Sequence, residues 1–229
     1  MEGTKLLPKT RVHEDRLTWI PLQMLTGIET ANQYIVQNAM GQTIYSAAED
    51  SGFCMRNLCG YLRSFEMLIV DNYGTQVMEM HRPLKCQFPC GLQRLDVMAP
   101  PGTLIGFVEQ KWHIAPRYRI KNSIGDEIFF LKGPLCTCNL CCGDVEFNVF
   151  SSRDKSQVGR IAKKWGGLGR ELFTDADIFG IEFPLDLDVN MKAVLLGACF
   201  LIDFMYFEDN ADRNRTRDTA IYECRGEWD

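Results

Sequence analysis

The sequence predicts a mainly β protein, an antiparallel barrel or sandwich closed around a C-terminal apolar helix. Two observations lead to this prediction. Short runs of β-branched and aromatic residues recur between Asn/Gly turns from about residue 34 onward, as in sandwiches and barrels. Residues 193–207 are apolar on every helical face except at Asp203, so a helix there must be buried in protein or in lipid. A barrel with an interior has to fill it, and this helix is the natural filling.

Three segments of similar design predict β-hairpins, because Asn and Gly tolerate the positive φ angles of tight turns. They are residues 34–45, 67–78 and 118–129. Further strands are predicted at 92–97, 104–110 and 144–149, the first two separated by the turn Pro100-Pro101-Gly102. The expected organisation is a short N-terminal arm over 1–27, one domain over 28–208 and a polar tail over 209–229.

The apolar segment 193–207 could be buried either in the barrel interior or in a lipid bilayer. It is about 15 residues long, or roughly 22 Å as a helix, whereas a membrane span needs about 20 residues. An Asp at mid-bilayer costs roughly 2.5–3.5 kcal/mol on insertion scales. Length and Asp203 therefore favour a buried core helix, and a transmembrane helix is the alternative.

Composition narrows the function classes. The 229 residues carry a net charge of -5 with a pI near 5.3, which argues against a dedicated nucleic-acid binder. The chain has ten cysteines, and Met1–Thr10 is polar with no signal-peptide pattern, so reduced thiols are expected rather than a disulfide framework. No nucleophile–His signature, phosphate-binding loop or dinucleotide turn is present, so the chain is not expected to be an enzyme.

An acidic stretch precedes the helix and could hold a hard cation. Asp175, Asp177 and Asp186 stand at positions 1, 3 and 12 of a loop with Gly180 at position 6, as in part of an EF-hand pattern. Phe179 stands where that pattern wants an oxygen ligand, so a calcium site here would be weak. The alternative is a solvated acidic turn that leads into the helix.

The cysteines form two groups with three interpretations: S-acylation, zinc binding or simple burial. The groups are Cys86 with Cys90, and Cys136, Cys138, Cys141 and Cys142. Zinc is the weakest interpretation, because no second CxxC accompanies Cys138-x-x-Cys141.

A basic stretch, residues 160–165, carries Arg160, Lys163, Lys164 and Trp165. It could contact anionic lipid or a nuclear transport receptor, or be an ordinary strand edge.

Several motifs together make the chain similar to the phospholipid scramblase family, over about residues 27–208. They are Ala99-Pro100-Pro101-Gly102-Thr103, residues 141–147 (CCGDVEF), residues 158–165 (VGRIAKKW), and above all residues 174–189 (TDADIFGIEFPLDLDV), followed by 191–193 and 197–205. The resemblance implies a tubby-like antiparallel β-barrel closed around a C-terminal hydrophobic helix. It also implies calcium-activated, ATP-independent, bidirectional movement of phospholipids between leaflets.

The resemblance also implies roles for particular residues. The family's calcium segment maps onto Asp175, Asp177, Phe179, Ile181, Phe183 and Asp186. Its palmitoylated cysteine run maps onto Cys86 and Cys90, and its nuclear import segment onto residues 159–168. The resemblance therefore implies membrane phospholipids and signalling proteins as partners. It also implies attachment at the cytoplasmic face, mainly of the plasma membrane, and a nuclear pool of the protein.

The chain departs from the family pattern in three respects, one of which is a longer tail after Glu208. Its cysteine run is sparser, and it has no long Pro-rich N-terminal tail, so SH3 and WW modules are not expected to bind. The competing hypothesis for its function is a non-catalytic, membrane-attached adaptor that responds to lipid or calcium. Physically, a helix that fills a barrel cannot also span a bilayer unless the domain unfolds.

Overall fold

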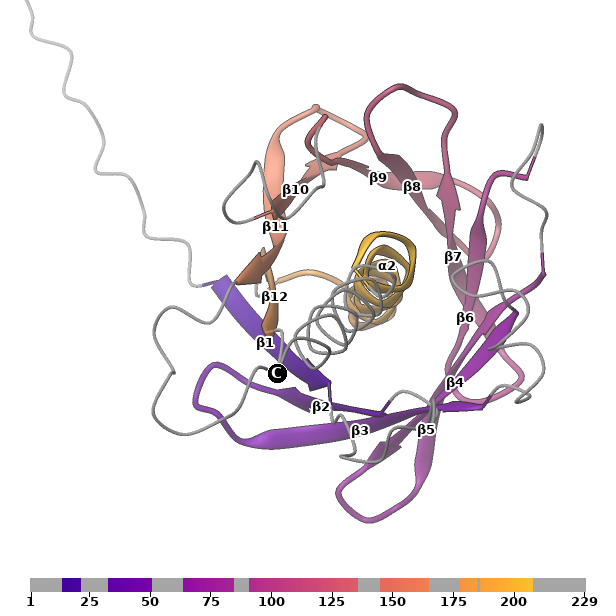
Figure 1. Ribbon diagram of the computed structural model, residues 1–229, viewed down its shortest axis with the longest axis vertical. Helices are drawn as coiled ribbons and strands as arrows, with labels where there is room; N and C mark the ends of the chain where they lie inside the picture. The colour runs from indigo at the N-terminus through magenta and orange to yellow at the C-terminus, as the bar shows by residue number, and fades with distance from the viewer. Residues whose placement is uncertain are drawn as a thin grey trace, which may run out of the picture.

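The computed structural model describes residues 14–21, 33–50, 64–84, 91–135, 145–164, 178–184 and 186–207. They form one antiparallel β-sheet curled around a single helix (Figure 1). The strands are β1 Glu14–Pro21, β2 Gln33–Gln37, β3 Thr43–Asp50, β4 Phe65–Asp71, β5 Gln76–Arg82, β6 Arg94–Met98, β7 Leu104–Gln110, β8 Arg117–Asn122, β9 Glu127–Lys132, β10 Val145–Ser151, β11 Gln157–Lys164 and β12 Ile178–Pro184; the helix is α2 Val189–Tyr206. The predicted mainly β fold with an apolar C-terminal helix is confirmed.

The strands are ordered as simply as a sheet allows. From β2 to β12, each strand pairs with its neighbours in sequence. The first strand, β1, pairs with β2 through Pro21 and Tyr34 and with β12 through Glu14 and Pro184, so the strand order returns on itself as a barrel. The ring therefore depends on one strand that joins the two ends of the sheet.

The tight turns form as their sequences predict. Gly41, Gly74 and Gly125 have φ values of 76°, 78° and 97°, which a side chain would disfavour. In the first of these turns, the carboxamide oxygen of Asn38 accepts hydrogen bonds from the backbone N–H groups of Met40 and Gln42. The three predicted hairpins correspond to β2–β3, β4–β5 and β8–β9 and are confirmed.

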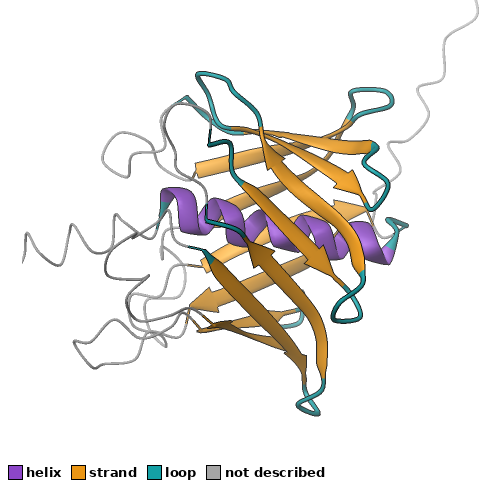
Figure 2. Cartoon of the chain, turned by 90° about the vertical axis from the view of Figure 1, so that its right-hand side faces the viewer, coloured by secondary structure: helices purple, strands orange, loops and turns teal. Residues whose placement is uncertain are grey.

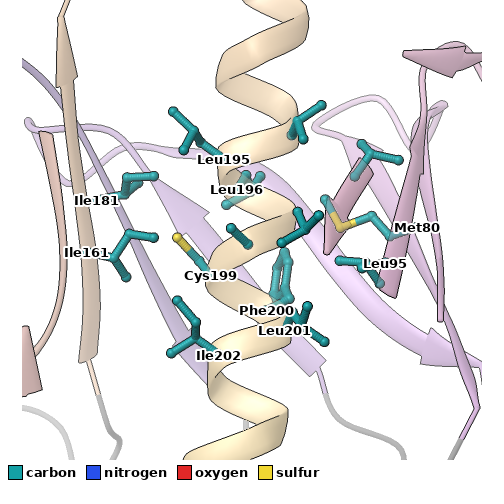
Figure 3. Packing of buried hydrophobic residues seen from close by; sticks show 14 of the residues in the cluster. Met80, Leu95, Ile161, Ile181, Leu195, Leu196, Cys199, Phe200, Leu201 and Ile202 are labelled. Carbon is teal, nitrogen blue, oxygen red and sulfur yellow. The ribbon is translucent and has the colours of Figure 1, made fainter. Parts of the chain in front are cut away.

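The helix α2 runs through the interior of the barrel (Figure 2). It begins after Asp188, whose carboxylate accepts a hydrogen bond from the N–H of Met191 as an N-cap. From Val194 to Phe204, every residue is buried, so the helix presents no solvent face over these three turns. Figure 3 shows how side chains of the strands, such as Met80, Leu95 and Ile181, surround the middle of the helix.

The two ends of the barrel differ. One end, which we call the hairpin rim, holds the turns at 38–42, 72–75, 99–103, 123–126 and 152–156 and the start of α2. The other end, which we call the C-terminal rim, is where β3, β5, β7, β9 and β11 end, where the even-numbered strands begin, and where α2 ends. Its connections are longer, and residues 51–63, 85–90, 136–144 and 165–177 within them lie outside the described residues.

Three elements differ from the predictions. The helix begins at Val189, four residues before the predicted start at 193, because Asp188 supplies the cap. The predicted arm 1–27 contains β1, which is part of the sheet. The acidic stretch was predicted as a loop, but Ile178–Pro184 within it is the strand β12.

Candidate functional site

The centre of the predicted calcium segment lies in a strand, with its side chains in the core. Phe179, Ile181 and Phe183 alternate along β12 and are 1%, 0% and 2% exposed. Glu182, between Ile181 and Phe183, lies on the outer face and pairs with Arg160, as the period of two requires. The apolar side chains therefore pack against the helix, and only backbone carbonyl groups of these residues could serve a metal.

The strand β12 separates the acidic residues of the predicted calcium segment along the sequence. Asp186 is exposed and follows β12 at the hairpin rim, whereas Asp175 and Asp177 precede β12 in the sequence and lie outside the described residues. Seven strand residues span roughly 23 Å at about 3.3 Å per residue. A single EF-hand-like ring that included Asp186 would require β12 to leave the sheet. Among the residues that the structure describes, no group of three or more metal-ligating side chains occurs.

The predicted basic surface is divided between the two faces of β11. Arg160 is exposed and pairs with Glu182 on β12, Nε to Oε2 at 2.6 Å, and with Glu146 at 3.5 Å. Lys163 is only 2% exposed, and its ammonium group lies 4.3 Å from the ring centroid of Phe207 and 5.3 Å from that of Phe179. Lys163 therefore does not share a surface with Arg160, because their positions three apart on a strand place them on opposite faces. The side chain of Lys164, and all of Trp165, lie outside the described residues.

The last two turns of α2 carry polar contacts with the barrel wall. Asp203 is 8% exposed and accepts a hydrogen bond from the Tyr34 hydroxyl at 3.1 Å. One turn earlier, burial and then the nearby Asp203 carboxylate raise the pKa of the Cys199 thiol well above its usual value. Cys199 is thus a buried, unreactive thiol rather than a ligand or nucleophile.

A second polar contact joins the end of the helix to β8. The Tyr118 hydroxyl lies 3.0 Å from that of Tyr206. Burial, followed by the interaction with Tyr206, raises the pKa of Tyr118 well above its ordinary value, and burial also raises the pKa of Tyr206. Both phenols therefore stay protonated, which keeps the contact intact through the physiological range.

A buried cation completes this end of the core. Arg82 is fully buried, and its guanidinium donates to the carboxamide oxygen of Gln93 at 2.9 and 3.1 Å. It also lies over the ring of Phe65, which stacks on Phe204 of the helix with a centroid separation of 4.1 Å. Sequence reasoning missed Arg82, Gln93 and Tyr34, since nothing local distinguishes a buried polar residue at a strand end from an exposed one.

The predicted acylation and zinc sites fall on segments outside the described residues. Cys86 and Cys90, and Cys136, Cys138, Cys141 and Cys142, all lie outside the described residues. The described strand ends that bound their segments, Arg82 with Arg94 and Lys132 with Val145, all lie at the C-terminal rim. The zinc and acylation interpretations remain predictions.

The family model described as Scramblase matches residues 16–209. The chain is 52% identical to phospholipid scramblase 2 of Bos taurus over 82% of this chain and 65% of that protein. It is 49% identical to phospholipid scramblase 1 of Homo sapiens over 85% of this chain and 62% of that protein. It is also 46% identical to phospholipid scramblase family member 5 of Homo sapiens over 82% of this chain and 70% of that protein.

The chain spans a little under two thirds of the length of the first two of these relatives. No solved structure matches it significantly. Within the described residues, α2 is long and apolar enough to cross a membrane, and 72% of that segment is buried inside the protein. A core helix and a membrane span both satisfy such a length and composition test.

Proposed function

This chain belongs to the phospholipid scramblase family, and on that basis we propose that it moves phospholipids between the two leaflets of a membrane. The observation that carries the proposal is the match of the family model to residues 16–209, which include all twelve strands but the first two residues of β1, and the whole of α2. The proposed movement is bidirectional and independent of ATP, consistent with a sequence that contains no nucleotide-binding motif. It involves no covalent chemistry, so the chain acts as a lipid transporter rather than as an enzyme.

We propose further that Ca²⁺ activates this movement through Asp175 and Asp177, with palmitate on Cys86 and Cys90 and no zinc. Support for calcium comes from the carboxylate pair and the family resemblance. Backbone carbonyls at the start of β12, near Phe179, could add oxygen ligands. Because β12 separates Asp186 from this pair, Asp186 is expected to contribute little to the same ion.

The test uses fluorescent phospholipid exchange in liposomes that contain the purified chain, without ATP and with either Ca²⁺ or EGTA. Asp177→Asn should reduce the Ca²⁺-dependent rate, whereas Asp186→Asn and the exposed-strand control Glu66→Gln should leave it near the wild-type value. Equal rates with Ca²⁺ and with EGTA in the wild type would refute calcium activation. No exchange under any condition would refute scrambling.

One structural observation favours a second function, that of a membrane-attached adaptor for signalling or nuclear partners. The helix is enclosed by the barrel and held by the Tyr34–Asp203 hydrogen bond, so crossing the bilayer would require the domain to open. In this proposal, acylated cysteines attach the folded barrel to the cytoplasmic face. Labelling Cys224 with an impermeant maleimide on intact cells separates the alternatives: labelling from outside means that α2 spans the membrane, and protection means that it does not.

A further inference from the structure

Part of the C-terminal rim exposes a row of large apolar side chains. We call it the rim patch and define it as Leu84, Leu92, Trp112, Ile114 and Leu135. Their exposed fractions are 52%, 39%, 80%, 94% and 79%. A soluble protein commonly exposes single apolar residues, but several on neighbouring connections indicate an interaction site.

Backbone hydrogen bonds place the segments that carry these residues next to one another. The N–H of Gln110 donates to the carbonyl of Gln93 at 2.8 Å, which joins the Leu92 segment to the end of β7. The N–H of Gly133 donates to the carbonyl of Pro116 at 2.8 Å, which joins the Leu135 segment to the start of β8. The segments that carry Leu92, Trp112, Ile114 and Leu135 are therefore neighbours along the C-terminal rim, and Leu84 follows the end of the adjacent strand β5.

The two most exposed members sit on a connection that has a defined shape. The N–H of Lys111 donates to the carbonyl of Arg117 at 2.8 Å and closes the base of the loop 111–116. Within the loop, the N–H of Ala115 donates to Nδ1 of His113 at 3.1 Å. Trp112 and Ile114 thus project from an internally bonded loop, and an interaction there would not have to order the loop first.

Cations flank the rim patch. Lys111 is exposed, and Arg117 is half-buried beside it. Lys132 is also exposed, but its ammonium group lies 4.6 Å from the ring centroid of Phe150 and 5.3 Å from that of Phe130, on the outer wall of the barrel. In the described segments 83–84, 91–93, 109–117 and 131–135, the one acidic residue is Glu109, and it is paired with Lys121 at 2.8 Å and with Arg94 at 3.3 Å. The local charge is therefore positive although the whole chain is acidic.

The hairpin rim offers a natural comparison, since it also exposes apolar side chains. Tyr73 and Ile124 there are 94% and 81% exposed. They lie in turns beside carboxylates, Asp71 in one turn and Asp126 in the other. Both rims thus expose apolar side chains. Among the described segments of the rim patch and the turns of Tyr73 and Ile124, cations lie beside the exposed apolar residues only in the rim patch.

We propose that the rim patch docks the barrel onto the surface of a bilayer that contains anionic phospholipid. Trp112 and Ile114 enter the headgroup region, and Lys111 and Arg117 contact lipid phosphate and carboxylate groups. Tryptophan suits this position because its ring is apolar and its N–H remains able to bond at the interface. The assignment rests on the proposed function only in taking a membrane as the partner.

The docking sets the orientation of the whole domain. The C-terminal end of α2 faces the bilayer, and the hairpin rim with Asp186 and Asp188 faces away from it. The helix remains enclosed in this arrangement, so membrane contact requires no opening of the barrel.

The test is co-sedimentation of the full chain with vesicles of phosphatidylcholine alone or mixed with phosphatidylserine. The double variant Trp112→Ser/Ile114→Ser is compared with Tyr73→Ser/Ile124→Ser, a matched pair on the hairpin rim. The first should lower the partition coefficient on mixed vesicles about tenfold or more, given the burial of two large side chains. The second should leave it within about twofold of the wild type. Because all four side chains are exposed, thermal unfolding should be nearly unchanged in both.

A charge variant, Lys111→Gln/Arg117→Gln, should remove most of the preference for phosphatidylserine over phosphatidylcholine. Equal binding of the two Ser variants, or a larger loss from the hairpin-rim pair, would overturn the proposal. Normal binding without lipid exchange would contradict the proposed scrambling and leave the docking surface intact, so the two failures can be told apart.

Discussion

Replacing Tyr34 by Phe removes one hydroxyl group and tests how firmly α2 is held in the barrel. The hydroxyl donates to Oδ2 of Asp203 at 3.1 Å, and both residues are buried. The ring itself packs edge-on against Phe200 at 5.1 Å between centroids, and phenylalanine keeps that contact. The substitution therefore removes a hydrogen bond to a buried acidic side chain and leaves the apolar packing in place.

The expected loss in unfolding free energy is about 1.5–3 kcal/mol, the usual range for a hydrogen bond to a charged group. Urea denaturation of the purified chain, followed by tryptophan fluorescence, measures it. Tyr73→Phe is the matched control, because Tyr73 is 94% exposed and should change stability by less than about 0.5 kcal/mol.

The single variant Asp203→Ala and the double variant Tyr34→Phe/Asp203→Ala complete a cycle that isolates the interaction between the two side chains. A coupling energy near zero, or a loss for Tyr34→Phe as small as that of the control, would refute the view that this contact anchors the helix. If anchoring holds and scrambling requires the helix to leave the barrel, the variant should also exchange lipid faster than the wild type.

Three further outcomes are expected. Phe204→Ala should lower the unfolding free energy by about 3–5 kcal/mol, because the ring is buried and stacked on Phe65. The control Val189→Ala, at the exposed start of the helix, should have little effect. Similar urea midpoints for the two variants would contradict the enclosed helix. Glu182→Gln should cost about 0.2–1 kcal/mol at low salt, and the difference should disappear near 1 M NaCl; a loss that persists at high salt would mean that the Arg160 pair is not the cause. The raised pKa of Tyr118 stabilises the fold below pH 10, and this contribution is lost as the pH rises through the folded-state pKa. Tyr118→Phe should therefore reduce the fall of the thermal unfolding midpoint at alkaline pH. An unchanged dependence of the midpoint on pH would exclude the Tyr118 phenol as the cause of that fall.

The hairpins could be predicted from sequence because their signals are local. Asn38 accepts a hydrogen bond from Gln42 and Gly41 adopts the positive φ of the turn, all within five residues, so no distant part of the chain decides this conformation. The helix was predictable for a similar reason, since its apolarity on every side leaves it no stable exposed position. Its start at Val189 was missed because the apolar run that set the predicted start begins only at residue 193, whereas the cap is the polar residue Asp188.

The strand β12 was harder to predict because two patterns overlap in one stretch. Phe179, Ile181 and Phe183 alternate as a half-buried strand requires, but the acidic residues around them suggested a metal loop. The burial of Lys163 was not predictable either, because its aromatic partners, Phe179 and Phe207, come from later parts of the chain. A basic run of residues does not say which of its members turn inward.

The pairing of the first strand with the last has a kinetic consequence. Glu14 meets Pro184 only after every intervening strand has been made, and the residues that fill the interior, Val189–Tyr206, are made later still. Strands that are neighbours in the sequence can pair one after another by closing short loops. The pairing of β1 with β12 joins distant parts of the chain and is therefore slow. During synthesis, the nascent sheet therefore exposes an apolar concave face until the helix arrives. In that interval the chain is most prone to aggregation and most dependent on chaperones.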